Sequence, residues 1–256
     1  MSRTSKTAPS PLDARAREIV ERLHAQNRHQ FARSIWPLTR EMVKAKFGTG
    51  NWDSTRTDSG KELLADKMVA LDPEKAALCH LLCRSIRART VVEIGTSFGV
   101  STIYLAAAVR DVGNDTGNGT GNDTGNDTGE DGLVIGTEHE PGKVEIAEKN
   151  LADAGVKDHA EILPGDLLET LPPRLAALAD RDRPVDFVLM DIWIPMALPA
   201  LELLIPHLRP GALVVCDNVV SAASDYAGYL DRVRNSGVFV SVTVPGQGGT
   251  EISMKV

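Results

Sequence analysis

The sequence predicts an α/β protein whose mostly parallel sheet is covered by helices on both faces. From Thr90 onward, five short apolar segments alternate with five segments of helical pattern. The first apolar segment passes through a glycine-bearing turn directly into a helix, which is typical of ligand-binding parallel sheets. The chain ends in two alternating strands around Pro245, Gly246 and Gly248, which we expect to form an antiparallel hairpin.

Each element follows from its own pattern. The expected strands are apolar runs at 91–94, 133–137, 160–163, 185–190 and 212–216, and the hairpin strands lie at 239–244 and 250–256. The helices between them are expected at 101–110, 141–153, 167–179, 196–208 and 224–235. Upstream, we expect helices over 11–47 and 61–71 with a loop over 47–60, then a helix to about Arg89 that Asp72 caps and Pro73 opens.

Three regions organise the chain. Residues 1–10 are expected to be disordered, residues 11–89 to form an N-terminal helical cap, and residues 90–256 to form the ligand-binding domain. Residues 113–131 repeat Asn, Asp, Thr and Gly without one apolar side chain, which predicts a flexible surface loop. Its Asn-x-Thr sequons and its calcium-like composition are weaker readings, because a secretory signal and the apolar residue of calcium-binding repeats are both lacking.

Composition narrows the classes of partner. A net charge of −7 and 4% aromatic residues argue against nucleic acid, which needs a basic face and stacking platforms. Three cysteines fit a reducing compartment, and neither a membrane span nor a secretory signal is visible. We therefore expect a cytoplasmic protein with a small-molecule partner and no membrane association.

The turn after the first strand has the pattern E-x-G-x-x-x-G, from Glu93 through Gly95 to Gly99. A strand, a glycine turn and a helix N-terminus together aim backbone N–H groups at one point. The spacing differs from the G-x-G-x-x-G of dinucleotide sites, which disfavours a nicotinamide dehydrogenase. An acid at the strand end favours hydrogen bonds or a cation over phosphate.

Every expected parallel strand ends in an acid. Once the repeat is discounted, Glu138 follows the turn at roughly the 20-residue spacing of an acid that holds ribose hydroxyls. Gly165 and Asp166 end the third strand, where Asp166 could meet an adenine amino group or cap the next helix. Asp191 ends the fourth strand, and Asp217 with Asn218 ends the fifth. Oxygen ligands at one sheet edge suit a magnesium-type cation.

Taken together, these segments resemble the small, metal-dependent class I S-adenosylmethionine-dependent O-methyltransferases, relatives of catechol and caffeoyl-CoA O-methyltransferases. The resemblance covers about residues 60–256. It rests on three segments of the chain: VVEIGTSFGVST, GTEHEP and DFVLMDIW…LLIPHLRPGALVVCDNV. It implies a Rossmann-like methyltransferase fold with strand order 3-2-1-4-5-7-6, transfer of a methyl group to a phenolic or catechol-like hydroxyl, and a possible homodimer.

The resemblance also implies roles for individual residues. Asp191, Asp217 and Asn218 would hold Mg²⁺ or a similar divalent cation, and Asp191 and Trp193 would be catalytic. Glu138 would hold the ribose of S-adenosylmethionine, and the other cofactor-binding residues would be Glu93, Gly95, Ser97, Gly99, Ser101, His139, Gly165, Asp166 and Asp191.

The chain departs from the resemblance at Ile194, where relatives often carry a lysine that helps to deprotonate the acceptor. A metal-bound hydroxyl would still have a lowered pKa, and orientation alone favours methyl transfer. Two alternatives remain open: a metal-independent methyltransferase acting on another oxygen or on nitrogen, and an S-adenosylmethionine-binding protein with weakened catalysis.

Overall fold

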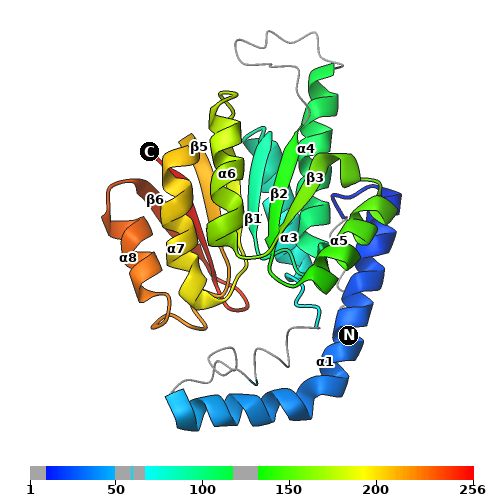
Figure 1. The fold of residues 1–256 in the computed structure, drawn as a ribbon, viewed down its shortest axis with the longest axis vertical. Helices are drawn as coiled ribbons and strands as arrows, with labels where there is room; N and C mark the ends of the chain where they lie inside the picture. The colour runs from blue at the N-terminus through cyan, green and yellow to red at the C-terminus, as the bar shows by residue number, and fades with distance from the viewer. Residues whose placement is uncertain (1–9, 50–58, 60–66, 118–131) are drawn as a thin grey trace, which may run out of the picture.

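A seven-stranded sheet forms the centre of the protein, with strands in the order β3-β2-β1-β4-β5-β7-β6 (Figure 1). The structure is a computed structural model that describes residues 10–49, 59, 67–117 and 132–256. Five strands are parallel, and β7 pairs antiparallel with both β5 and β6. The strands are β1 Thr90–Ile94, β2 Leu133–Glu138, β3 Ala160–Pro164, β4 Val185–Met190, β5 Leu208–Cys216, β6 Phe239–Val244 and β7 Thr250–Lys255.

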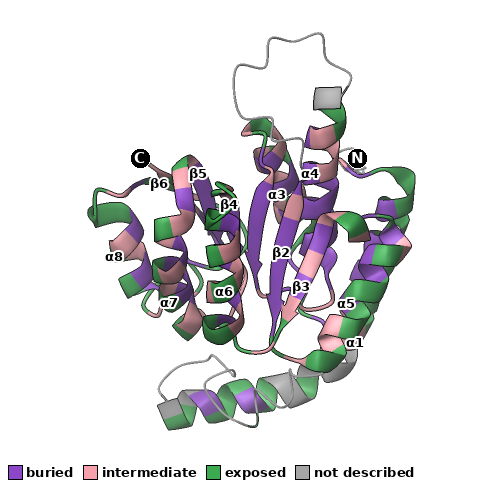
Figure 2. Ribbon diagram, turned by 45° about the horizontal axis from the view of Figure 1, so that its top comes forward, coloured by how far each residue is buried: buried purple, intermediate pink, exposed green. Residues whose placement is uncertain are grey.

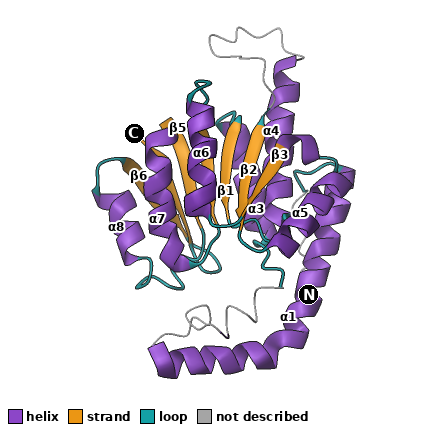
Figure 3. Ribbon diagram, in the orientation of Figure 1, coloured by secondary structure: helices purple, strands orange, loops and turns teal. Residues whose placement is uncertain are grey.

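Helices cover both faces of this sheet (Figure 3). One face carries α3, α4 and α5, with the start of α1 packed outside them, and the other carries α6, α7 and α8. Within the described residues, no helix is long and apolar enough to cross a membrane. The helices are α1 Ala14–Thr49, α3 Pro73–Ser85, α4 Val100–Gly117, α5 Pro141–Ala154, α6 Leu167–Ala179, α7 Ile194–Leu204 and α8 Ala227–Asn235, with 3₁₀ turns η2 Lys157–His159 and η3 Ile205–His207.

The apolar core has two parts, one on each face of the sheet. Figure 2 shows that the central strands between them are largely buried. In β4, Phe187 and Leu189 pack toward α3, α4 and α5, whereas Val188 and Met190 pack toward α6, α7 and α8. Successive side chains of a strand point to opposite faces, so a run of apolar residues fills both layers at once. This explains why these strands are predominantly apolar in sequence rather than alternating between apolar and polar residues.

The N-terminal helix has two halves with different surroundings. Leu12, Val20 and Leu23 are buried in the core on the α4–α5 side. The helix contains Pro37, which lacks the N–H of a regular helical bond, and its second half bends away to run below the carboxyl ends of the strands (Figure 1). Trp36 and Phe47 on that half are exposed.

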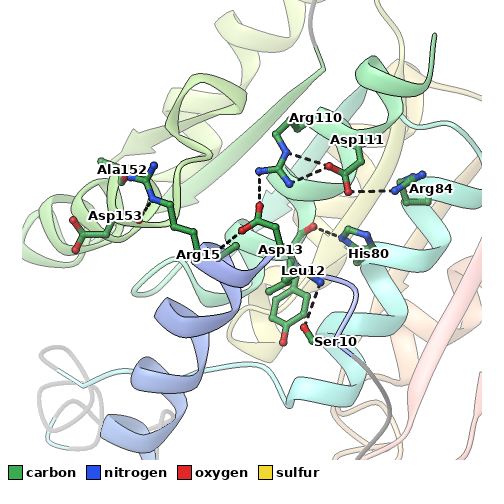
Figure 4. A network of polar contacts seen from close by, with 12 residues as sticks. Ser10, Leu12, Asp13, Arg15, His80, Arg84, Arg110, Asp111, Ala152 and Asp153 are labelled. Atoms are coloured by element: carbon green, nitrogen blue, oxygen red, sulfur yellow. Dashed lines mark hydrogen bonds and ion pairs between the residues drawn. The ribbon is translucent and has the colours of Figure 1, made fainter. Parts of the chain in front are cut away.

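A polar network fixes the start of α1 to the domain (Figure 4). Asp13 caps the helix by accepting a hydrogen bond from Ala16 N at 2.9 Å, and its other carboxylate oxygen pairs with Arg110 at 2.9 Å. Arg15 donates to the carbonyl oxygens of Ala152 and Asp153 at the end of α5. Burial acts to raise the pKa of Asp13, but the Ala16 and Arg110 hydrogen bonds outweigh it and lower that pKa.

The predicted order of elements is confirmed, with differences at their ends. The structure places Lys67–Leu71 in a bend and loop, so the helix expected over 61–71 is wrong there, and its first six residues lie outside the described ones. Because Met68 exchanges two hydrogen bonds with the Gln30 side chain, this segment is held extended. Helix α4 continues to Gly117, past the expected start of the loop at 113, and α3 ends at Ser85, short of Arg89. The expected disorder of residues 1–10 and the loop after 117 fall almost wholly outside the described residues.

Replacing the cap of α1 should measure how firmly the helix is held. We expect Asp13→Ala to lower the free energy of unfolding by about 1 kcal/mol, a typical value for a lost N-cap, measured by urea denaturation. Because the pKa of Asp13 is lowered on folding, this contribution is complete at neutral pH and is lost as the pH falls through the folded-state pKa. Asp13→Asn, which retains a cap, is the control; equal losses in both variants would contradict the capping role.

Candidate active site at the carboxyl edge of the sheet

Backbone hydrogen bonds join the ends of the five parallel strands beyond their ladders. Thr96 N donates to Thr137 O across β1 and β2, and Gly165 N donates to Glu138 O across β2 and β3. Asp191 N likewise donates to Ile94 O, and Asp217 N to Met190 O. The loops that follow these strands therefore begin side by side along one edge, the lower one in Figure 3.

The turn between β1 and α4 has no space for a side chain at its first glycine. Gly95 has φ +95°, and a Cβ there would lie 2.1 Å from Asp191 O at the end of β4. Ser97 and Gly99 also have positive φ, of 50° and 81°. Such backbone favours glycine, and here the turn can approach the neighbouring strand closely.

Glu93 lies wholly buried beneath this turn. Its Oε2 accepts hydrogen bonds from Thr102 Oγ1 at 2.5 Å and Thr96 Oγ1 at 3.0 Å. Its Oε1 has no hydrogen-bond partner among the described residues. Burial raises the pKa of Glu93, while hydroxyls around it, including that of Ser101, oppose the shift. A buried carboxylate oxygen without a partner is unusual and indicates a missing donor or cation.

Glu138 and Asp166 are held by backbone N–H groups at the neighbouring strand ends. Glu138 Oε2 accepts from Ser97 N at 2.8 Å, and its Oε1 accepts from Glu140 N at 2.9 Å. Asp166 Oδ1 accepts from Leu168 N at 2.8 Å, so this residue is the N-cap of α6. A carboxylate has about four lone-pair positions, so both residues keep acceptor capacity for a ligand.

Several expected site residues are exposed at this edge or have other partners. His139 is exposed, and Trp193, directly before α7, is 42% exposed. The Ser97 hydroxyl accepts from Val69 N at 3.1 Å, which ties the segment before α3 to the turn. Ile194, at the position where relatives often have lysine, packs against the apolar core on the α7 side.

Asp191 and Asp217 influence one another electrostatically. Burial, then the negative charges of Asp217 and Glu93, raise the pKa of Asp191 to about 7. Asn218, the third expected ligand, has φ 62° and its Oδ1 lies against Gly248, where a Cβ would come within 2.4 Å. The three residues expected to hold a metal thus lie on adjacent strand ends, with the Asn218 oxygen beside the β6–β7 turn.

A lysine that sequence reasoning missed pairs with this acidic group. Lys75 Nζ lies 2.5 Å from Asp217 Oδ1, with 15% of the lysine side chain and 7% of the aspartate side chain exposed. The same oxygen accepts from Thr250 Oγ1 at 3.0 Å. Lys75 is the third residue of α3, so the N-terminal region contributes directly to the candidate site. The sequence did hold one indication of its role: Lys75 is a cation in the first turn of a predicted helix, where the helix dipole favours acidic residues.

The described side chains do not fit a divalent cation while Lys75 occupies this position. Asp217 Oδ1 already accepts hydrogen bonds from Lys75 Nζ and Thr250 Oγ1, and Asn218 Oδ1 lies against Gly248. An ammonium and a divalent ion about 4 Å apart would repel by roughly 8 kcal/mol at an effective dielectric constant of about 20.

The same edge does fit a cationic nucleoside. Glu93 has a buried carboxylate oxygen without a hydrogen-bond partner, and Gly95 has no side chain to block a ligand from the backbone of the turn. The carboxylates of Glu138 and Asp166 can each accept further hydrogen bonds. A sulfonium nucleoside that carries an amino group brings positive charge and ribose hydroxyls without phosphate. Fold and site together define an α/β protein whose strand-end edge has the chemistry to accept a nucleoside.

Comparison with known families narrows this class. A profile described as "Methyltransferase domain" matches residues 92–219, half of the chain, and the chain therefore belongs to this methyltransferase family. A catechol O-methyltransferase of Mycobacterium tuberculosis (strain ATCC 25618 / H37Rv) is 32% identical over 152 residues, which are 59% of this chain and 58% of that protein. The chain thus matches just under three fifths of that relative's length.

Solved structures of similar proteins have the same fold. Cofactor-bound Rv0187 from MTB superposes with a TM-score of 0.58 at 25% identity, covering 75% of this chain and 84% of the other. The O-methyltransferase TomG from Streptomyces achromogenes, in complex with SAM, gives a TM-score of 0.58 at 26% identity and covers 73% and 82%. The expected α/β methyltransferase fold is confirmed.

The Gly95 turn can be tested with a matched pair of glycines. We expect Gly95→Ala to lower the free energy of unfolding by at least about 2 kcal/mol, through overpacking and positive φ, and to abolish S-adenosylmethionine binding. Gly142, in α5, has open space around it, so Gly142→Ala should change stability by less than about 1 kcal/mol and leave binding intact. Urea denaturation measures the free energy of unfolding, and calorimetric titration measures S-adenosylmethionine binding. Wild-type behaviour of Gly95→Ala would refute the close approach.

Proposed function

We propose that this protein is an S-adenosylmethionine-dependent O-methyltransferase acting on the hydroxyl of a small phenolic or catechol-like acceptor. The observation that carries the proposal is the row of acids at the carboxyl edge, from Glu138 through Glu93 and Asp191 to Asp217, in a methyltransferase-family fold. Support for the acceptor class comes from the named catechol O-methyltransferase relative, and support for O-methyl transfer from S-adenosylmethionine comes from TomG.

On the cofactor side, the residues of the chain bind and orient S-adenosylmethionine. Glu138, already fixed by Ser97 N and Glu140 N, accepts hydrogen bonds from the ribose, and Asp166 accepts from the adenine amino group near His139 and Gly165. The turn formed by Gly95, Ser97, Gly99 and Ser101 encloses the methionine part, with Glu93 Oε1 facing positive charge. S-adenosylmethionine, when bound, supplies the methyl group on a sulfonium sulfur.

On the acceptor side, Trp193 and the ends of β4 and β5 surround the hydroxyl. With S-adenosylmethionine bound, the acceptor oxygen would bond to the methyl carbon, the sulfur–carbon bond would break with its electron pair left on sulfur, and the hydroxyl proton would leave to water. Such a displacement depends on close, aligned approach of the reacting atoms, which rigidly positioned strand ends provide. Ile194 is an aliphatic side chain that packs against the core, so the position that often carries lysine in relatives contributes no base to this step.

A divalent cation held by Asp191, Asp217 and Asn218 is what the family resemblance implies for the acceptor. The Lys75–Asp217 pair favours the metal-independent form of the same reaction. The homodimer and the cytoplasmic location stay predictions from the resemblance and the sequence.

Glu138 offers a direct test of the cofactor geometry. We expect Glu138→Ala to weaken S-adenosylmethionine binding roughly 10- to 100-fold, because hydrogen bonds to a charged group contribute about 1.5–3 kcal/mol. Glu140→Ala is the matched control, since the Glu140 side chain makes no capping bond at α5. Calorimetric titration measures the S-adenosylmethionine affinity of both variants. Equal affinities would show that Glu138 does not bind the cofactor.

Methylation of a phenol panel tests the proposed reaction. Catechol, single-hydroxyl phenols and aromatic amines are each incubated with S-adenosylmethionine, and products are read by mass spectrometry. We expect one added methyl group on phenolic oxygen. Methylation of the amines alone would contradict the O-methyl assignment, and cofactor binding without any product would indicate the weakened-catalysis alternative.

A further inference from the structure

Lys75 lies where local physical chemistry disfavours it. It occupies the first turn of α3, at the positive end of the helix dipole, and most of its side chain is removed from water. Both features cost free energy for a cation, and the contact with Asp217 offsets them. Residues that break a local rule in this way occur preferentially at functional sites.

Other groups confirm that the first turns of α3 face the acidic edge. Cys79, one helical turn after Lys75, is buried, and its pKa is raised by burial and then by the charges of Asp217, Asp191 and Glu93. The Lys75 charge opposes the rise in the pKa of Cys79 and of Asp191, and it is outweighed in both cases. Lys75 is thus the cation that acts on Asp217 and Asp191 together.

We propose that the Lys75 ammonium is the resident cation of the acceptor site and takes the place of a divalent metal. This inference rests on the proposed function. Asp217, whose Oδ1 also accepts a hydrogen bond from Thr250 Oγ1, anchors the ammonium, and two of the three ammonium N–H donors remain for acceptor oxygens. A developing phenolate is stabilised by this positive charge, which is carried by a side chain mostly withdrawn from water.

An ammonium in place of a divalent metal ion changes which acceptors the site can bind. A chelating metal ion binds two neighbouring oxygens of a catechol at once, whereas an ammonium is a point charge that can donate to a single oxygen. The acceptor class therefore includes phenols with one isolated hydroxyl, and a vicinal pair is not required. Ile194 is consistent with this arrangement, because the cation enters from α3 rather than from α7.

Manganese binding tests the inference without relying on activity. Mn²⁺ is titrated into the full-length protein and followed by electron paramagnetic resonance of the free ion. We expect no binding by the wild type at millimolar Mn²⁺, and binding by Lys75→Ala and Lys75→Met, where two carboxylates are left without their cation. Lys149→Ala, which removes an exposed lysine elsewhere, should not bind. Wild-type binding as tight as that of the Lys75 variants would overturn the inference, as would a failure of both variants to bind.

Activity gives a second readout once a methylated phenol is found. We expect wild-type turnover to survive EDTA, Lys75→Met to lose about 10²-fold in kcat, and Lys75→Arg to recover part of it. Loss of wild-type turnover in EDTA would overturn the inference. S-adenosylmethionine affinity should be unchanged in the Lys75 variants. A wild type that methylates no phenol defeats the proposed function, while the Mn²⁺ titration still decides the role of Lys75.

Discussion

The close packing of the β1–α4 turn against the end of β4 is the constraint on which the site depends. Gly95 lies where any Cβ would meet the Asp191 carbonyl oxygen, and Asp191 N bonds back to Ile94 O. This contact fixes the direction of the turn and the position of the Asp191 side chain together. The other strand ends are joined to it by single backbone hydrogen bonds, so the residues proposed to hold the cofactor and the acceptor lie along one connected edge.

Electrostatics explain why such an edge needs cations. Glu93, Asp191 and Asp217 are largely withdrawn from water, and their charges act on one another. Buried like charges are stable only when they are neutralised or paired. A sulfonium nucleoside with an amino group can meet the charge near Glu93, and Lys75 meets the charge at Asp217. The protein therefore supplies at least one of the compensating cations from its own side chains.

Much of this arrangement could be predicted from the sequence, because local patterns encode it. Apolar runs predicted the strands, and acids at or just beyond their carboxyl ends predicted the edge, since parallel strands end together. The Asp72 cap and Pro73 placed α3 correctly. Lys75 was missed because its partner lies 142 residues away, and only the packing of α3 brings them together. The path of residues 67–71 was missed because the side chains of Gln30 and Ser97, not local propensity, hold it.

A crystal structure of the protein with S-adenosylhomocysteine and a phenolic acceptor, grown with Mg²⁺ present, tests the central claim most directly. The account predicts ribose hydroxyls on Glu138, an acceptor oxygen within hydrogen-bond distance of Lys75 Nζ, and no metal between Asp191 and Asp217. A Mg²⁺ ion held by Asp191, Asp217 and Asn218, with Lys75 turned away, would contradict it.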